Sequence, residues 1–493
     1  MKYVNIYIKT GGDLYSQYGF QHFIGKYQIL LPNIAVFKKP ELNDHISKME
    51  NNENYQNKLL KLEDIFRTIG LILSGSFEKS ENSNLLEKEK TRLGIPNTPA
   101  VDYLEKQIFN SILNTCKKLK SPLVLKSFWP YGKKFAVCLT HDVDEVRKTY
   151  QYITRSLRCI KNRDLNCLKN QFMTLLQKIK GKEPYWTFED IISMERKLGV
   201  RSTFFFLNEN AKVNIFDPST WRHYGRKFNI KDPKVVNLIR SLHSGGWEVG
   251  LHGSFYSYKD AEKLKREKEI LEEVLGDKIH GTRQHNLNLS IPETWKYHEE
   301  IGLEYDTTLG FNDRIGFRWG TSFPFCPLDK EGRRVMKLLE IPLIIEDIAL
   351  FSYNDPWREF IKIVNEVERC GGVLTLLWHH SVFNCVEFPG WAEMYKKIVE
   401  YCKNRGAWIA NGYDIARWWK MREESRLDVE YRDDRLIIIP ANKTHDYFID
   451  IYTPNGRKAK VSSNAEVIRA NKDLLTISIR NLQENEKVII EFL

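Results

Sequence analysis

Short apolar runs alternate with stretches of helical spacing through the middle of the chain, between residues 131 and 424. One of these stretches starts with a capping residue at Asp260, has apolar residues at helical spacing and stops at Gly276, so it predicts a helix. Apolar strands that alternate with helices are typical of a parallel sheet covered on its faces, or of a barrel. We therefore expect an α/β fold with strands at Phe135–Thr140, Thr203–Leu207, Trp247–Leu251, Leu303–Thr307, Leu339–Ile345, Val373–Trp378 and Ala407–Ala410.

The N-terminal region has a mixed pattern. Strand-like runs occur at Val4–Ile8 and Ile29–Val36, and Tyr103–Leu119 has helical spacing. The polar stretch Ser76–Ser83 predicts a loop. We therefore expect residues 1–130 to form an α/β accessory domain that precedes a barrel at 131–424.

The C-terminal region is predicted to contain strands only. The helical pattern stops near residue 425, and Pro454–Gly456 is a strong turn signal. We expect a small all-β, sandwich-like module over 425–493, with strands at Arg435–Ile439, Tyr447–Thr453, Leu474–Ile479 and Val488–Phe492.

Composition narrows the class of protein. The chain has 493 residues, of which 42% are hydrophobic, enough for large buried cores in two to four domains. Its net charge of +11 fits an anionic glycan, a lipid-phosphate carrier, a membrane surface or nucleic acid. Because the sequence has no zinc-finger or RNA-binding signature, we expect no nucleic-acid partner.

The segment Arg147–Glu183 concentrates positive charge, with ten Lys or Arg residues against two acids. Apolar residues at helical spacing run through it, which predicts a basic amphipathic pair of helices. Two interpretations are open. The helices either cap the barrel with a solvated face, or they contact an anionic partner such as a membrane surface.

The cysteine pattern and the first ten residues give an expectation for the cellular compartment of the protein. The eight cysteines form no CxxC pair and are predicted to be reduced core thiols. Residues 1–10 lack the apolar stretch of a signal peptide, and no run of 18 apolar residues occurs anywhere. We therefore expect a cytoplasmic protein without a spanning helix, with association at the membrane face left open.

Polar side chains follow the ends of several predicted strands. They occur in Thr140–Asp144, His252–Ser254, Arg283–His285 and Trp378–His380. In a parallel α/β barrel the carboxyl ends of different strands converge on one pocket. We therefore expect these side chains to meet.

The residue types suit hydrolysis of an amide at a metal ion. A divalent metal lowers the pKa of bound water to about 7, and catalytic zinc typically has three protein ligands and one open position. An aspartate and two histidines fit that set, while a second carboxylate can act as base and another histidine as acid. The chain supplies this inventory in Asp142, Asp144, His252, His285 and His379.

These motifs resemble the polysaccharide deacetylase family (NodB homology, carbohydrate esterase family 4) over residues 131 to about 420. Thr140–Asp144 is similar to the family motif Thr-Phe-Asp-Asp, in the variant form that has one residue between the aspartates. The resemblance implies a distorted (β/α) barrel of the NodB type and a divalent metal, with Zn²⁺ expected. It also implies that Asp142 is the catalytic base and Asp144 a metal ligand.

The second and third motifs supply the other ligands. His252 matches the first histidine of the family motif His-Ser/Thr-x-x-His and is expected to bind the metal, but Tyr256 replaces the second histidine. His285 is our candidate for the missing ligand. It follows Arg283, which matches the family arginine that orients the base.

The fourth and fifth motifs supply the remaining catalytic candidates. Asp306 resembles the family aspartate near the catalytic histidine, and His379 matches Leu-x-x-His and is expected to be the general acid. Trp319, Tyr256 and His380 are further candidates for substrate contact, although Trp319 fits core packing equally well.

Structural roles are open alternatives for the same residues. Asp142 and Asp144 could cap a helix that begins at Glu145, and His252 or His285 could be a satisfied core histidine. His379 and His380 could bond to backbone at a strand end, and Asp306 could be a turn residue. Three acids beside an apolar strand, Glu340, Glu346 and Asp347, are additional pocket candidates.

Three functions are compatible with this pattern. The first is removal of N-acetyl groups from an amino-sugar unit of a polysaccharide, glycolipid precursor or carrier-linked sugar. The second keeps the metal site but hydrolyses an O-acetyl ester or another amide. The third is a glycan-binding scaffold without catalysis, suggested by the tyrosine at position 256.

Overall fold

The structure is a computed structural model, and it describes residues 13–30, 64–76, 93–209, 216, 226, 228–440, 446–453, 458–479 and 486–493. The predicted strand Val4–Ile8 and the turn at Pro454–Gly456 lie outside these residues. So do residues 31–36 of the strand predicted at Ile29–Val36 and residues 77–83 of the predicted loop.

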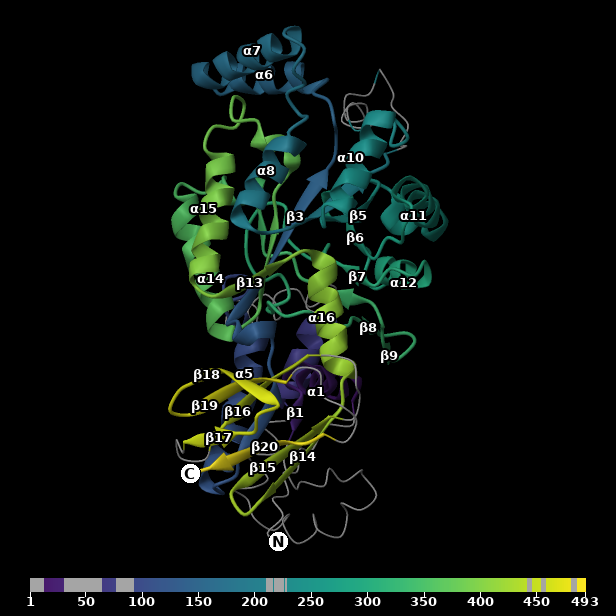
Figure 1. Cartoon of the computed structure of the whole chain (residues 1–493). Helices are drawn as coiled ribbons and strands as arrows, with labels where there is room; N and C mark the ends of the chain where they lie inside the picture. Colours follow the sequence, from purple (N-terminus) through teal and green to yellow (C-terminus); the bar gives the residue numbers. More distant parts are fainter. Residues whose placement is uncertain are drawn as a thin grey trace.

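A curled sheet of parallel strands occupies the centre of the molecule (Figure 1). Its strand order is β10-β7-β6-β5-β4-β3-β12-β11, and β13 pairs with β3 beside this path. Together with flanking helices and the all-β sheets at the C-terminus, it confirms the predicted α/β fold of the distorted-barrel type. The strands are β3 (Phe135–Val143), β4 (Thr203–Leu207), β5 (Glu248–Gly253), β6 (Gly281–Gln284), β7 (Tyr305–Asp306), β10 (Leu339–Glu340), β11 (Ile345–Glu346), β12 (Val373–Leu377) and β13 (Ala407–Ala410).

The prediction of one strand at Leu339–Ile345 is wrong, because this run forms two short strands at opposite edges of the sheet. β10 pairs with β7, and β11 pairs with β12. Between them, the backbone N–H of Ile341 donates to Asp306 O at 2.8 Å, and that of Ile344 donates to Thr375 O at 3.2 Å. The run therefore crosses from one edge of the curled sheet to the other.

Helices pack around the sheet, with α14 and α15 on one side and α10, α11 and α12 on the other (Figure 1). The helix predicted after Asp260 is confirmed as α11: the Asp260 carboxylate accepts a hydrogen bond from Lys263 N at 3.0 Å, and the helix ends at Gly276 with φ 81°. The barrel helices are α8 (Phe188–Leu198), α10 (Pro233–Ser244), α11 (Ala261–Leu275), α12 (Glu293–Glu300), α13 (Asp347–Leu350), α14 (Pro356–Cys370), α15 (Trp391–Asn404) and α16 (Gly412–Glu424).

The period of two along β3 separates two environments. Phe135, Val137 and Leu139 are buried in the main hydrophobic core, whereas Ala136 and Cys138 belong to a second cluster with aromatic residues such as Tyr305. Because successive side chains of a strand point to opposite faces, Thr140 and Asp142 continue the face that carries Ala136 and Cys138. The sequence of β3 thus places polar side chains on one face of the strand near its carboxyl end.

Two antiparallel sheets form the C-terminal part and enclose their own apolar core. The first has the order β1-β2-β16-β19-β18, so two strands from the N-terminal region complete it. The second has the order β14-β15-β20-β17. Their strands are β1 (Ile29–Leu30), β2 (Leu123–Lys126), β14 (Leu427–Arg432), β15 (Arg435–Pro440), β16 (Tyr447–Tyr452), β17 (Ala459–Val461), β18 (Ala465–Ala470), β19 (Leu474–Ile479) and β20 (Val488–Phe492).

Two helices of the N-terminal region, α1 (Leu14–Tyr27) and α5 (Ala100–Lys118), pack between this β part and the barrel (Figure 1). The helix predicted at Tyr103–Leu119 is confirmed by α5. A small hairpin of β8 (Leu328–Asp329) and β9 (Arg334–Val335) projects beside the barrel. No described helix is long and apolar enough to cross a membrane.

The predicted basic pair of helices is present as α6 (Gln151–Lys161) and α7 (Leu165–Ile179), which form a hairpin at one end of the molecule (Figure 1). Cys159 and Cys167 are joined by a disulfide across this hairpin, with Cα atoms 5.6 Å apart. The prediction that all eight cysteines are thiols is therefore wrong for this pair, because the short turn brings the two helices side by side. The other six cysteines are free.

Candidate active site

Two carboxylates stand at the carboxyl end of β3. Asp142 lies on the strand and Asp144 directly follows it, so the residue between them places both carboxylates toward the same side. The side chain of Asp142 is 4% exposed and that of Asp144 is 15% exposed. No helix begins at Glu145, since the next described helix starts at Gln151, and the capping alternative for these aspartates does not apply.

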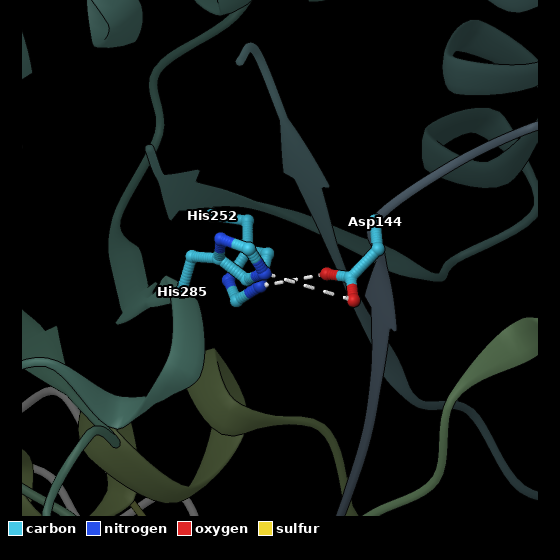
Figure 2. A group of neighbouring side chains, drawn as sticks. All are labelled: Asp144, His252 and His285. Atoms are coloured by element: carbon cyan, nitrogen blue, oxygen red, sulfur yellow. Dashed lines mark hydrogen bonds and ion pairs between the residues drawn. The ribbon is translucent and has the colours of Figure 1, made fainter. Parts of the chain in front are cut away.

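Two imidazoles from neighbouring strands face Asp144 (Figure 2). His252, on β5, has its Nε2 at 3.1 Å from Asp144 Oδ1 and 3.6 Å from Asp142 Oδ2. His285, directly after β6, has its Nε2 at 3.9 Å from Asp144 Oδ2. The parallel pairing of β5 with β6 brings the two histidines to the same end of the sheet.

The backbone fixes the tautomer of His252. Its Nδ1 lies 2.7 Å from the carbonyl oxygen of Arg283, and because a carbonyl only accepts, Nδ1 carries the proton. In the neutral ring Nε2 then presents a lone pair toward two carboxylates. Such contacts are favourable only when a positive charge lies between the nitrogen and the oxygens, either a proton or a metal ion.

His285 has buried nitrogens that need a partner. The residue is 2% exposed, and neither ring nitrogen has a hydrogen-bond partner among the described residues. Burial lowers the pKa of His285 well below its ordinary value, against the opposing charge of Asp144. A neutral imidazole with a free lone pair is the form that binds a metal.

The three side chains fit a divalent metal. Asp144, His252 and His285 each offer one ligand atom, and these atoms lie within 4.8 Å of one another. Burial alone would raise the pKa of Asp144, but His285, His252 and Arg226 lower it well below its ordinary value, so it is ionised. One carboxylate and two imidazoles form a ligand set typical of catalytic zinc, with metal–ligand distances of about 2.0–2.2 Å.

Arg283 holds Asp142 in place from inside the barrel. Its Nη1 donates to Asp142 Oδ1 at 2.9 Å and to Thr140 Oγ1 at 2.7 Å, and its Nε donates to Thr307 O at 3.0 Å. The guanidinium is fully buried. One Asp142 oxygen is therefore engaged by the arginine, while Oδ2 faces His252.

His379 lies two residues after the end of β12 and is paired with Asp347. Its Nδ1 is 2.9 Å from Asp347 Oδ1, and its backbone N–H donates to Asp347 Oδ2 at 2.6 Å. Burial would lower the pKa of His379, but Asp347, with further contributions from Asp144 and Asp142, raises it well above its ordinary value. These carboxylates therefore favour the protonated form of His379, whose ring is oriented through Nδ1 with Nε2 left to donate.

Glu346 is a further buried acid beside this pair. Glu346, Asp347 and His379 could by residue type also hold a metal. Here, however, both carboxylate oxygens of Asp347 are hydrogen-bonded to His379, and burial raises the pKa of Glu346 to about 8. A protonated glutamic acid and an engaged aspartate are poor ligands, so the Asp144 group is the better metal site.

Asp144 and His379 are the most exposed side chains of this group, at 15% each. Asp142, His252 and His285 are at most 4% exposed and form the floor.

Solved structures of similar fold include polysaccharide deacetylases. A candidate polysaccharide deacetylase from Mycobacterium smegmatis is 20% identical, with a TM-score of 0.40, over 60% of this chain and 94% of that chain. A variant of the peptidoglycan deacetylase PdaC from Bacillus subtilis is 11% identical, with a TM-score of 0.28, over 60% and 96%. A CE4 family pseudoenzyme from Bacillus anthracis is 12% identical, with a TM-score of 0.31, over 58% and 66%.

The chain is similar to polysaccharide deacetylases of the CE4 family. No family model matches it, and no curated protein matches it. Because one fold hosts many functions, the activity of this chain has to be argued from its own side chains.

The remaining site candidates lie at different distances from this centre. Tyr256, in place of the family's second histidine, is 55% exposed and packs its ring on Phe255. His380 accompanies His379 but turns away from it: its ring stacks on Phe188, and its Nδ1 lies 3.0 Å from the backbone oxygen of Asp142. Burial lowers the pKa of His380 to about 4.

Asp306 and Trp319 belong to a neighbouring buried network. Asp306 accepts from Trp295 Nε1 at 2.9 Å and from the Thr308 hydroxyl, and its coupling to Glu340 helps to raise the pKa of that acid beyond the effect of burial. Trp319 is 3% exposed and packs edge-on against Trp295. Neither residue contacts the groups around Asp144 through a described hydrogen bond or ion pair.

Asp347 is a site residue whose role was not predicted from the sequence. It was only one of three additional acids, without a role. Its contact with His379 follows from the pairing of β11 with β12, in which Glu346 lies opposite Leu377. This pairing brings the residues that follow the two strands close together. The signal in the sequence was an acid at the end of an apolar run, which alone does not reveal its partner.

Proposed function

We propose that this protein is a metal-dependent deacetylase that hydrolyses the N-acetyl amide of an amino-sugar unit. The observation that carries the proposal is the paired arrangement of His252 and His285 on Asp144. One imidazole has its tautomer set by a backbone carbonyl, and the other has two buried nitrogens that find no hydrogen-bond partner among the residues that the structure describes. Zn²⁺ is the proposed metal, held by Asp144, His252 and His285.

A bound divalent ion would make a water nucleophilic near neutral pH and polarise the acetyl carbonyl. The Oδ2 of Asp142 accepts the proton of the attacking water, while Arg283 holds Oδ1 and keeps the carboxylate oriented. His379, kept protonated by Asp347, donates its Nε2 proton to the departing nitrogen. Asp142 and His379 thus perform the two proton transfers that amide hydrolysis requires.

The protonated His379 favours an amide over an ester. An amine leaves an acyl carbon readily only when it is protonated, whereas an alkoxide leaves with less help. A histidine whose pKa is raised well above its ordinary value is suited to that demand. O-deacetylation at the same site is the second candidate, and a non-catalytic scaffold is the third.

Acetate release tests the proposal. The zinc-loaded protein is assayed on matched N-acetylated and O-acetylated amino sugars, alongside Asp142→Asn and a control variant, Asp428→Asn, on an exposed position of β14. We expect the wild-type protein to release acetate from N-acetylated sugars. Asp142→Asn should lose turnover, whereas the control should keep wild-type turnover. Acetate only from esters would favour the second candidate, and a protein that neither binds zinc nor turns over would be the scaffold.

The proposed location is the cytoplasm or its membrane face, as the sequence predicted. The disulfide between Cys159 and Cys167 points the other way, because disulfides persist mainly in oxidising compartments. Fractionation of cells that express the full chain, with trapping of free thiols, decides between the two.

A further inference from the structure

The α6–α7 hairpin has its apolar residues on the outside. Eight of them have exposures between 41% and 80%, whereas the apolar side chains of the buried cores are at most 9% exposed. On α6 they recur at helical spacing (153, 157 and 160), and on α7 Leu165, Phe172, Leu175 and Ile179 share one side of the helix. We call this the hairpin face, and it comprises Ile153, Leu157, Ile160, Leu165, Phe172, Met173, Leu175 and Ile179.

The inner side of the hairpin is polar. The ammonium of Lys148 donates to Gln171 at 2.7 Å, Thr174 at 2.9 Å and Glu387 at 2.8 Å, all of them buried. Arg155 of α6 adds an ion pair to Glu387 at 3.0 Å. The hairpin is therefore attached to the barrel by buried hydrogen bonds and ion pairs, and its apolar side is directed away from the protein.

Charge decides what covers the hairpin face. Exposed basic residues border it, among them Arg158, Lys161, Lys169 and Lys180. The segment that contains the hairpin has ten basic residues and two acids. A second copy of the chain would bring like charges together, whereas an anionic membrane offers opposite charge to the basic border and an apolar interior to the exposed side chains.

We propose that the α6–α7 hairpin docks this protein on the surface of an anionic membrane. The hairpin face enters the boundary between headgroups and acyl chains, and the flanking lysines and arginines contact the headgroups. This requires no spanning helix, since amphipathic helices of this kind lie in the plane of the interface.

The position of the hairpin connects docking to the candidate active site. α6 begins shortly after Asp144, and Figure 1 shows the hairpin beyond the carboxyl end of β3. Its anchor Glu387 lies on the segment that follows His379. Resting on the proposed function, this geometry makes an acetylated amino sugar attached to a membrane lipid the substrate class.

Vesicle binding tests the docking without any need for activity. The full chain is mixed with vesicles of phosphatidylcholine alone and with vesicles that contain one third phosphatidylglycerol, and bound protein is measured by flotation. We expect binding to the anionic vesicles that is at least ten-fold stronger and that weakens with salt. The double variant Leu157→Glu with Phe172→Glu should lose it, because each side chain is 59% exposed and the change removes apolar contact.

Matched variants separate docking from other effects. Leu119→Glu with Val467→Glu alters side chains of comparable exposure, 50% and 45%, away from the hairpin and should keep full binding. Lys161→Gln with Lys169→Gln, at two exposed positions of the basic border, should lower binding to anionic vesicles several-fold. Circular dichroism and thermal unfolding check that each variant is folded.

Two outcomes would overturn the proposal. One is equal or no binding to both kinds of vesicle by the folded wild-type chain. The other is a dimer in light scattering that Leu157→Glu with Phe172→Glu dissolves, which would make the hairpin face a contact between copies. Acetate release from a water-soluble N-acetylated sugar should be unchanged in this double variant, so failure of docking and failure of the proposed function are distinguishable.

Discussion

The carbonyl oxygen of Arg283 lies 2.7 Å from Nδ1 of His252 and directs the other nitrogen of that ring toward Asp144. The same arginine uses its guanidinium to hold Asp142. One residue of β6 therefore sets the orientation of both a proposed metal ligand, through its backbone, and the proposed base, through its side chain. A single position in the barrel thus affects both the proposed metal binding and the proposed proton transfer.

Removal of either imidazole should weaken metal binding. We expect His252→Ala and His285→Ala each to lower zinc affinity by at least ten-fold, because each removes one of three proposed ligands. Zinc content after dialysis, together with calorimetric titration, measures the effect. Tyr256→Phe serves as control and should keep wild-type affinity, since this side chain is 55% exposed. Tight zinc binding by His285→Ala would remove His285 from the ligand set.

The two aspartates should differ in what they lose. Asp142→Asn keeps the shape of the side chain but cannot accept a proton, so we expect turnover to fall by about 10²–10⁴-fold while zinc stays bound. Asp144→Asn should lose zinc as well as turnover. Parallel measurement of kcat and metal stoichiometry distinguishes them. Equal zinc loss in both variants would contradict the separate roles.

Local patterns in the sequence predicted most elements of the fold. Asp260 and Gly276 bound α11 because a carboxylate cap and a left-handed glycine act within one helical turn. The run Leu339–Ile345 was predicted as one strand because five of its seven residues are Leu or Ile. Which neighbours its two ends pair with depends on how the sheet curls, and that curvature is set by segments far away in sequence.

In the candidate site, too, some contacts could be predicted from local sequence patterns and others could not. Strand-end position was enough to predict that Asp142, Asp144 and His252 approach one another, since parallel strands end at the same edge. The contact between Asp347 and His379 depends on the register of β11 against β12, which no local pattern encodes. The disulfide of Cys159 with Cys167 likewise depends on the tight turn of the hairpin.

The cap of α11 should contribute measurably to stability. Asp260→Ala removes the carboxylate that accepts from Lys263 N, and we expect the free energy of unfolding to fall by about 1 kcal/mol. Denaturant titration of the full chain gives the value. Lys265→Ala, at an exposed position inside the same helix, is the control and should change stability little. Equal effects in the two variants would show that the cap makes no special contribution.

The pH dependence of turnover should depend on Asp347. His379 donates a proton in the proposed mechanism, so activity requires its protonated form and falls as pH rises through its pKa. Burial would lower that pKa, but Asp347 raises it well above the ordinary value, which places the alkaline limb at high pH. Asp347→Asn removes this charge, so the alkaline limb should move to lower pH while zinc content stays the same. Glu366→Gln, on α14 away from the site, should leave the profile unchanged. The profile of kcat against pH measures the shift, and an alkaline limb that stays in place in Asp347→Asn would exclude His379 as the acid that the limb reports.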